Sequence, residues 1–164
     1  MVKCELTGKA YGDEATAVVI ELISFLHGGV DLRVTISLLS ISVKVETFVF
    51  GFNLSCWCNE LAAFRDGRAS NARFYDCDEM LILEIFKLED GTNCLSIANQ
   101  MYGSEQFSGL PSVEVDKTQK PIAAGSAFDF ALNGMRLDSP VEVISDFFVN
   151  LLRNQTIEVR NPYS

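Results

Sequence analysis

Residues 48–98 read FVFGFNLSCWCNELAAFRDGRASNARFYDCDEMLILEIFKLEDGTNCLSIA, and this stretch decides the expected fold. A β-patterned run leads into a short amphipathic helix, and an acidic turn and two more strand-like runs follow. Asn53 is a suitable N-cap, and Gly67 is placed to end the helix. Four apolar side chains then fall on one helix face, at i, i+3, i+7 and i+10: Leu54, Trp57, Leu61 and Phe64.

Strand-like patterns lie on both sides of this helix. The run Ala15–Leu26 fits a buried helix as well as a strand, but its β-branched residues favour a strand. Glu89-Asp90-Gly91 has the composition of a hairpin turn between two strands. The strands expected before the helix are Val2–Leu6, Thr16–Leu26 and one long run at Leu32–Phe50, and those expected after it are Asn71–Tyr75, Met80–Leu88 and Cys94–Asn99.

A second helix is expected near the C-terminal end. Ser139 is its predicted N-cap, Pro140 its first residue, and Glu142 completes a capping box. Its apolar stripe is wide enough to lie on a sheet, and consists of Val141, Ile144, Phe147, Phe148, Leu151 and Leu152. Before this helix the sequence predicts a weaker strand at Ser108–Val115, an exposed and mobile polar loop at Asp116–Ala124, and a strand through Phe128, Phe130 and Leu132 that ends before Asn133-Gly134.

Together these elements predict an α+β fold with a mainly antiparallel β-sheet and two amphipathic helices packed on it. The strands come in runs and do not alternate with helices, which is typical of this class. A chain of 164 residues, 48% of them hydrophobic and 12 of them Phe, can bury a sizeable core as a single domain over residues 1–164. A strand followed by a helix occurs twice, but the two copies share too few residues to be assigned as a repeat.

Charge and composition limit the classes of function. A formal net charge of -9 argues against nucleic acid and against an anionic membrane surface, because phosphate groups are bound by clustered Lys and Arg. Residues 1–12 have no secretory-signal pattern, and no apolar run is long enough to cross a bilayer, so a cytoplasmic protein is expected. The five cysteines are an odd number and are expected to be free thiols in a reducing compartment.

The residues give little support to catalysis. A Ser or Cys nucleophile needs a positioned base, and the one histidine, His27, follows an apolar run and is interpreted as its polar cap. Neither a glycine-rich phosphate loop nor a dinucleotide fingerprint occurs, so no cofactor is expected. The sequence therefore predicts no catalytic residues and a protein that is not an enzyme, with a metal- or carboxylate-dependent enzyme as a remaining alternative.

Cysteines and carboxylates are the two candidates for metal binding. Cys56 and Cys58 lie two residues apart, with Cys77 and Cys94 further along, but positions i and i+2 of a helix point about 200° apart and cannot both face one ion. We interpret the pair as two small helix side chains, one of them packed beside Trp57. No metal is expected, although the sequence leaves open whether any of these four cysteines binds one.

Two acidic sets could supply acid and base groups or ligands for a hard cation. The first is the turn Asp76, Asp78 and Glu79, and the second is Asp138, Glu142 and Asp146, at i, i+4 and i+8. Neither spacing matches a calcium loop, and acidic residues are common where a helix begins. We interpret them as a solvated loop and a solvated helix face.

The layout from Phe50 to Ala98 resembles small bacterial immunity proteins of the WapI type, which protect against contact-dependent toxins. The resemblance lies in the helix Leu54–Leu61 closed by Phe64, the acidic residues 76–79, the strand Leu81-Ile82-Leu83-Glu84-Ile85, and the Gly91 turn into Leu95 and Ile97. It implies a small, acidic, cytosolic protein without enzymatic activity that blocks a toxin by occlusion. Many such toxins are basic nucleases.

The leading functional hypothesis is accordingly a protein that neutralises a basic toxin by direct binding. Its expected contact residues are exposed carboxylates, because negative charge steers association with a positive surface. They are Asp76, Asp78, Glu79, Glu89 and Asp90. The alternative is a structural or accessory subunit of a homo-oligomer, for example a homodimer, joined through exposed β edges or through aromatic residues such as Phe48, Phe50 and Phe52.

Overall fold

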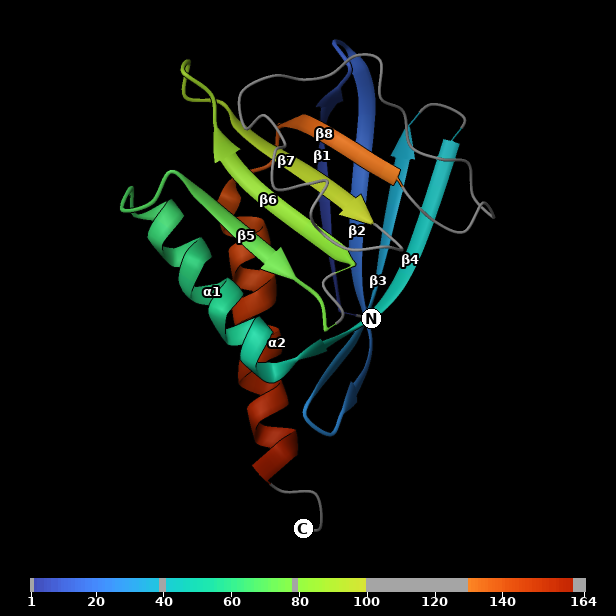
Figure 1. The fold of residues 1–164 in the computed structure, drawn as a ribbon, viewed down its shortest axis with the longest axis vertical. Helices are drawn as coiled ribbons and strands as arrows, with labels where there is room; N and C mark the ends of the chain where they lie inside the picture. The colour runs from blue at the N-terminus through green and yellow to red at the C-terminus, as the bar shows by residue number, and fades with distance from the viewer. Residues whose placement is uncertain (1, 39–40, 78–79, 100–129, 161–164) are drawn as a thin grey trace.

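Eight strands and two helices make up the part of the chain that the computed structural model describes, residues 2–38, 41–77, 80–99 and 130–160 (Figure 1). All the strands join one antiparallel sheet, which confirms the predicted α+β class. In chain order the elements are β1 (Lys3–Ala10), β2 (Glu14–Leu26), β3 (Gly29–Leu38), β4 (Ile41–Phe50), α1 (Gly51–Arg65), β5 (Asn71–Tyr75), β6 (Leu81–Lys87), β7 (Asn93–Asn99), β8 (Phe130–Leu137) and α2 (Val141–Arg160).

The sheet combines two meanders of four strands, each followed by a helix. The strand order is β4-β3-β2-β1-β8-β7-β6-β5, so the two meanders meet where β1 pairs with β8. Gly8 lies at this junction, where a Cβ atom would stand 2.0 Å from the Arg136 carbonyl oxygen. Only a residue without a side chain fits so close an approach of two backbones.

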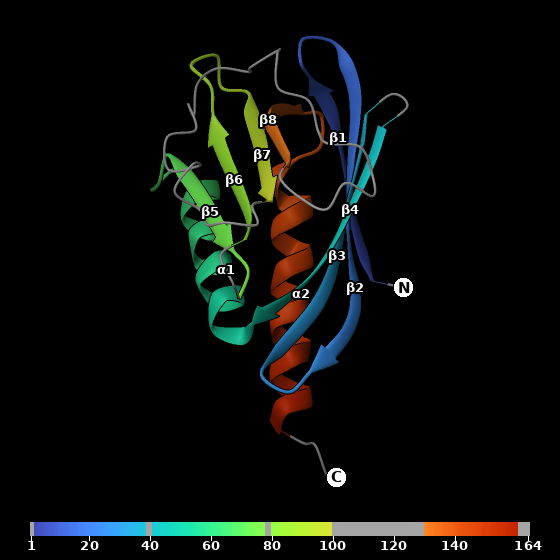
Figure 2. The same ribbon diagram turned by 45° about the vertical axis from the view of Figure 1, so that its right-hand side comes forward.

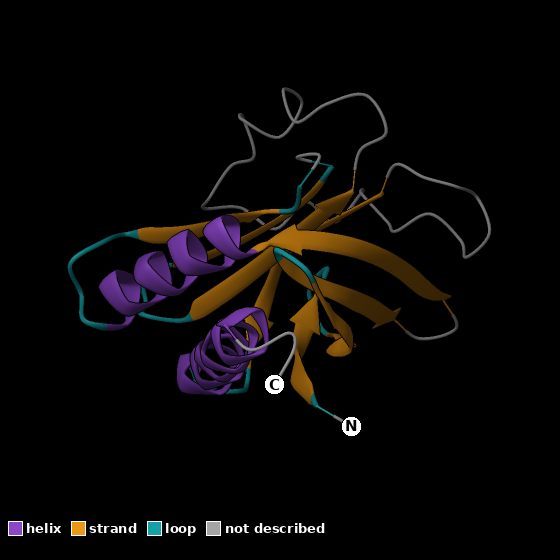
Figure 3. Ribbon diagram, turned by 90° about the horizontal axis from the view of Figure 1, so that it is seen from below, coloured by secondary structure: helices purple, strands orange, loops and turns teal. Residues whose placement is uncertain are grey.

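The two outer strands of the sheet also approach each other. Just beyond β5, the Cys77 N–H donates to the Phe48 carbonyl of β4 at 3.1 Å, and Thr47 Oγ1 donates to Asp76 Oδ2 at 2.6 Å. The sheet is therefore strongly curved. Figure 2 shows β1–β4 and β5–β8 as two diverging groups, and Figure 3 shows the two helices next to each other.

One continuous core fills the space between the strands and the helices. α1 packs on β5 and on α2, and α2 packs on β1. At the centre, the Trp57 ring contacts Phe74 and Phe148 at centroid distances of 5.6 and 5.8 Å. The predicted apolar faces are buried: Leu54, Trp57, Leu61 and Phe64 in α1, and Val141, Ile144, Phe147, Phe148 and Leu151 in α2, with Leu152 packed against them.

In the first half of the chain, two predictions are wrong and one alternative that the sequence left open is decided. Leu32–Phe50 is not one strand: β3 ends at Leu38 and β4 begins at Ile41, and the two pair as neighbours. The helical alternative for Ala15–Leu26 is wrong, because these residues belong to β2, which pairs with both β1 and β3. α1 begins at Gly51 and not after Asn53, whose side chain bonds the end of β5 instead.

Two boundaries in the second half also differ from the prediction. β8 does not end before Asn133-Gly134 but continues to Leu137, and a bulge in the β7–β8 pairing accommodates the extra residue. α2 begins at Val141, and Ser139 Oγ accepts a hydrogen bond from the Thr7 N–H of β1, which attaches the start of the helix to the sheet. The predicted strand Ser108–Val115, the predicted loop Asp116–Ala124 and Phe128 lie outside the described residues.

Phe148 gives a direct test of the core. Its side chain is buried against Trp57, Phe74 and Phe147, so Phe148→Ala should lower the free energy of unfolding by about 3–5 kcal/mol. The neighbouring Val149 is 37% exposed, and Val149→Ala should change it by no more than about 0.5 kcal/mol. Urea denaturation of both variants measures the difference, and equal stabilities would contradict this placement of α2.

Candidate functional site

Asp76, the first of the expected contact residues, is buried. Only 4% of it is exposed, and both carboxylate oxygens are bonded: Thr47 Oγ1 donates to Oδ2 at 2.6 Å and the Met80 N–H donates to Oδ1 at 2.8 Å. The expectation of an exposed carboxylate is therefore wrong at this position. A carboxylate stays in the interior only where hydrogen bonds replace its water, and here they join the turn after β5 to β4.

Replacement of Asp76 tests this structural role. Asp76→Ala leaves the Thr47 hydroxyl and the Met80 N–H without their acceptor, which should lower the free energy of unfolding by roughly 2–4 kcal/mol. Asp76→Asn keeps the shape and one good acceptor and should lose less. Urea denaturation measures both, and an Asp76→Ala variant as stable as the wild type would contradict the role.

Glu89 and Asp90 are exposed, as expected, in the turn between β6 and β7. The Thr92 N–H donates to Asp90 Oδ1 at 2.9 Å, and this bond lowers the pKa of Asp90. Asp78 and Glu79 lie outside the described residues. The turn at 76–80 precedes β6 and the turn at 88–92 follows it, so the length of this strand, on the order of 20 Å, separates the two acidic turns. Among the described residues of this set, Asp76 is therefore separated from Glu89 and Asp90 and shares no surface with them.

The other residues considered for chemistry are scattered. His27 is exposed in the β2–β3 turn, and Asp138, Glu142 and Asp146 are exposed along the start of α2. In the described ranges, no three His, Cys, Asp or Glu side chains come close enough together to hold a metal ion. Cys58 packs inward and Cys56 outward, as the helix geometry predicted.

The thiols differ enough in exposure to be told apart chemically. Cys56 is exposed, whereas burial raises the pKa of Cys4, Cys58 and Cys94 to about 11. At pH 8 these three side chains are overwhelmingly protonated and shielded, so a thiol reagent should modify Cys56 at least 100-fold faster. Mass spectrometry after timed alkylation identifies the labelled residue. Rapid labelling of Cys58 in the native protein would contradict the orientation of α1.

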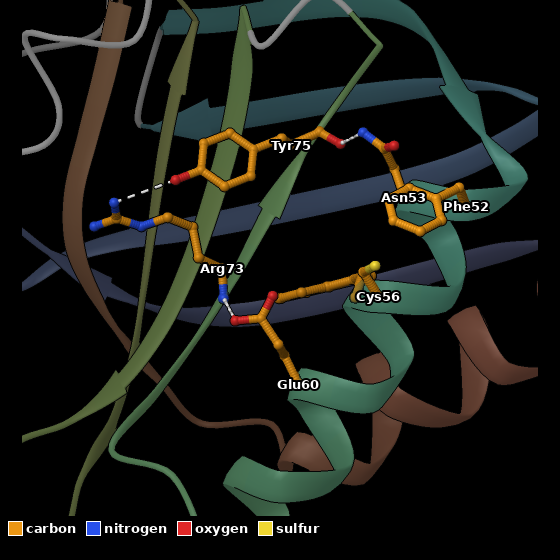
Figure 4. A pocket seen from close by; sticks show the side chains of 7 residues that line it. Phe52, Asn53, Cys56, Glu60, Arg73 and Tyr75 are labelled. Atoms are coloured by element: carbon orange, nitrogen blue, oxygen red, sulfur yellow. Dashed lines mark hydrogen bonds between the residues drawn. The ribbon is translucent and has the colours of Figure 1, made fainter.

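A cavity of about 250 Å³ lies between α1 and β5 (Figure 4). It was not predicted from the sequence. Asn53 and Glu60 lie seven residues apart, and this spacing returns nearly to the same helix face, but nothing in the sequence indicates that β5 lies opposite it. The lining residues are Phe52, Asn53, Cys56, Trp57 and Glu60 of α1 and Arg73 and Tyr75 of β5.

Two side chains of α1 bond the outer edge of β5 at either end of this cavity. Asn53 Nδ2 donates to the Tyr75 carbonyl at 3.0 Å, and Glu60 Oε1 accepts from the Arg73 N–H at 3.3 Å. Backbone groups of alternate residues in a strand point to the same side. The Arg73 carbonyl and the Tyr75 N–H therefore also point away from β6, toward α1, between the two bonded groups.

The charges around the cavity do not cancel. Arg73 Nε donates to Glu84 Oε2 at 2.7 Å, its Nη2 bonds the same oxygen, and its Nη1 donates to the Tyr75 hydroxyl at 3.3 Å. Burial lowers the pKa of Arg73, but these bonds to Tyr75 and Glu84 outweigh it and raise the pKa overall. The carboxylate of Glu84 thus compensates the positive charge of Arg73. The carboxylate of Glu60 makes no ion pair within the described residues, so one negative charge remains at the cavity.

An exposed apolar surface adjoins the cavity, and we call it the aromatic end. Leu26, Gly29 and Phe50 stand in one row across β2, β3 and β4. The Phe48 and Phe50 rings meet edge to face at a centroid distance of 5.1 Å, and Phe48 lies so close over Gly29 that a Cβ there would stand 2.7 Å from its ring. Phe52, two residues after Phe50 in the chain and 77% exposed, lines the cavity. The aromatic end comprises Leu26, Phe48, Phe50 and Phe52.

Comparisons with known proteins add no relative: no family model, no curated protein and no solved structure matches the chain. In the described part of the chain, neither helix combines the length and the apolar character needed to span a membrane.

Proposed function

We propose that this chain is a non-enzymatic cytoplasmic binding protein that occludes a basic protein partner, as an immunity protein of the WapI type does with its toxin. The observation that carries the proposal is the aromatic end. Phe50 and Phe52 are 48% and 77% exposed, and exposed aromatic residues beside a cavity are typical of the centre of a protein interface. The aromatic end supplies the short-range contact.

Charge supplies the long-range part of the proposed interaction. A net charge of -9 attracts a basic partner from a distance and raises the association rate, an effect that salt screens. Glu89 and Asp90 are exposed and can contribute to this attraction, whereas Asp76 is occupied within the fold. Glu89 and Asp90 follow β6, whereas the turn that contacts β4 precedes this strand. We therefore assign these two carboxylates to the long-range attraction of the partner and not to the contact surface.

We predict that a gene beside this one encodes a toxin domain, and the test mixes that domain with the purified chain. A stoichiometric complex is expected, with an association rate that falls as salt is raised. Phe52→Ser should raise Kd at least tenfold, mainly through faster dissociation, because it removes an apolar contact at the centre of the interface. Glu89→Lys with Asp90→Lys changes the net charge from -9 to -5 and should slow association severalfold at low salt.

Val149→Ser is the matched control, since it removes an exposed apolar side chain from α2, a helix that contributes no residue to the aromatic end. Surface plasmon resonance resolves the two rate constants. A complex that Phe52→Ser leaves unchanged would refute the contact surface, and an association rate independent of salt would refute the steering. Failure of the two proteins to associate would refute the proposal as a whole.

A homo-oligomer is the second candidate. The feature that favours it is β4, an outer strand of ten residues that carries Phe48 and Phe50 on its exposed side. An outer strand offers unpaired backbone groups to a second copy of the same strand, although the Phe48 carbonyl of β4 already accepts from the Cys77 N–H. Light scattering on the purified chain decides between the candidates: a stable dimer lost on Phe50→Ser favours the oligomer, and a monomer favours the binding protein.

A further inference from the structure

We infer that the cavity between α1 and β5 receives the side chain of an arginine from the basic partner. This inference rests on the proposed function and names the anchor residue of the partner. It follows from the charge, the size and the lining of the cavity, each of which limits the occupant independently.

The charge of the cavity favours a cation. Glu60 is exposed and bonds the Arg73 N–H through Oε1, which leaves Oε2 as an acceptor at the cavity. Arg73 is poorly placed to hold an anion, because three of its five N–H groups are already bonded, two to Glu84 and one to the Tyr75 hydroxyl, and the Glu84 carboxylate offsets its charge. Glu84 is itself buried, so this pair stays fixed within the sheet. An incoming cation therefore meets an available carboxylate and no competing positive charge from Arg73.

The size of the cavity favours one side chain over a larger ligand. Sites for drug-sized molecules usually measure about 300–1,000 Å³, and this cavity, at about 250 Å³, falls just below that range. Asn53 and Glu60 already bond the edge of β5 at two points, so a whole strand cannot add there. Space remains only between these two bridges.

The lining favours a planar guanidinium over a compact ammonium group. Phe52 and Tyr75 present aromatic rings at the cavity, and a guanidinium stacks on such rings while its N–H groups bond acceptors in the same plane. Two acceptors lie on this side of β5, the Glu60 carboxylate and the Arg73 carbonyl. Five N–H donors in a fixed fork match two acceptors and an aromatic face better than a point charge does.

The single tryptophan of the chain, Trp57, lines the cavity and reports its occupancy. N-acetyl-arginine amide is the probe, and N-acetyl-citrulline amide is its uncharged control of equal shape. The arginine probe should change Trp57 fluorescence saturably at millimolar concentration, and the citrulline probe should bind at least fivefold more weakly. Saturation by both probes alike, or by neither, would overturn the inference.

Glu60→Gln tests the carboxylate without removing the bond to Arg73, because the amide oxygen still accepts from its N–H. It should weaken binding of the arginine probe at least fivefold, and the matched control Glu142→Gln, an exposed carboxylate on α2, should not. Equal melting temperatures for wild type and Glu60→Gln exclude unfolding as the cause. Unchanged probe binding by Glu60→Gln would overturn the inference.

The same variant separates this inference from the proposed function. In the complex with the toxin domain, Glu60→Gln should raise Kd at least fivefold. If the complex forms and Glu60→Gln leaves its Kd unchanged, the inferred anchor is wrong while the proposed function stands; probe binding would then indicate a site for free arginine. If no complex forms, the proposed function fails, and the inferred protein anchor fails with it.

Discussion

The buried carboxylate of Asp76 holds together the two ends of the sheet, and the position of α1 depends on this contact. Its two oxygens bond Thr47 of β4 and the Met80 N–H after β5, and the Cys77 N–H bonds β4 next to them. α1 connects β4 to β5, so it must span two strands that are already adjacent. That restriction places the helix along the outer edge of β5, where the cavity lies.

The two junctions between the meanders are made differently. β1 and β8 pair through their backbones, and Gly8 allows the two strands to approach more closely than a side chain at this position would permit. β4 and β5 meet mainly through Thr47, Asp76 and one backbone bond, because α1 leads directly from one strand toward the other. Side chains of Asn53 and Glu60 then take the places that a ninth strand would occupy. The polar bridges thus protect the β5 edge from strand addition.

The sequence predicted the elements well wherever a local pattern determines them. The predicted bounds of β5 match the observed ones, and the spacing of the apolar residues gave the buried faces of both helices. These signals are local, because hydrophobic periodicity and turn residues act within a few positions of the chain. The predictions were wrong where a contact between residues far apart in the sequence determines the local structure. Asn53 is a good N-cap by residue type, yet its amide bonds Tyr75, and Asp76 looks like a surface residue until β4 supplies the Thr47 hydroxyl. No local signal separates Leu32–Phe50 into two strands.

The candidate site lay beyond sequence reasoning for the same physical cause. Its two walls are separated along the chain by the loop between α1 and β5, and its charge depends on a pairing across two strands, Arg73 with Glu84. Read singly, Arg73 would make this part of the molecule positive. Once Glu84 is placed opposite it, the surplus charge is that of Glu60, and the sign of the expected ligand reverses. The functional meaning of Arg73 is therefore set by its cross-strand partner, Glu84.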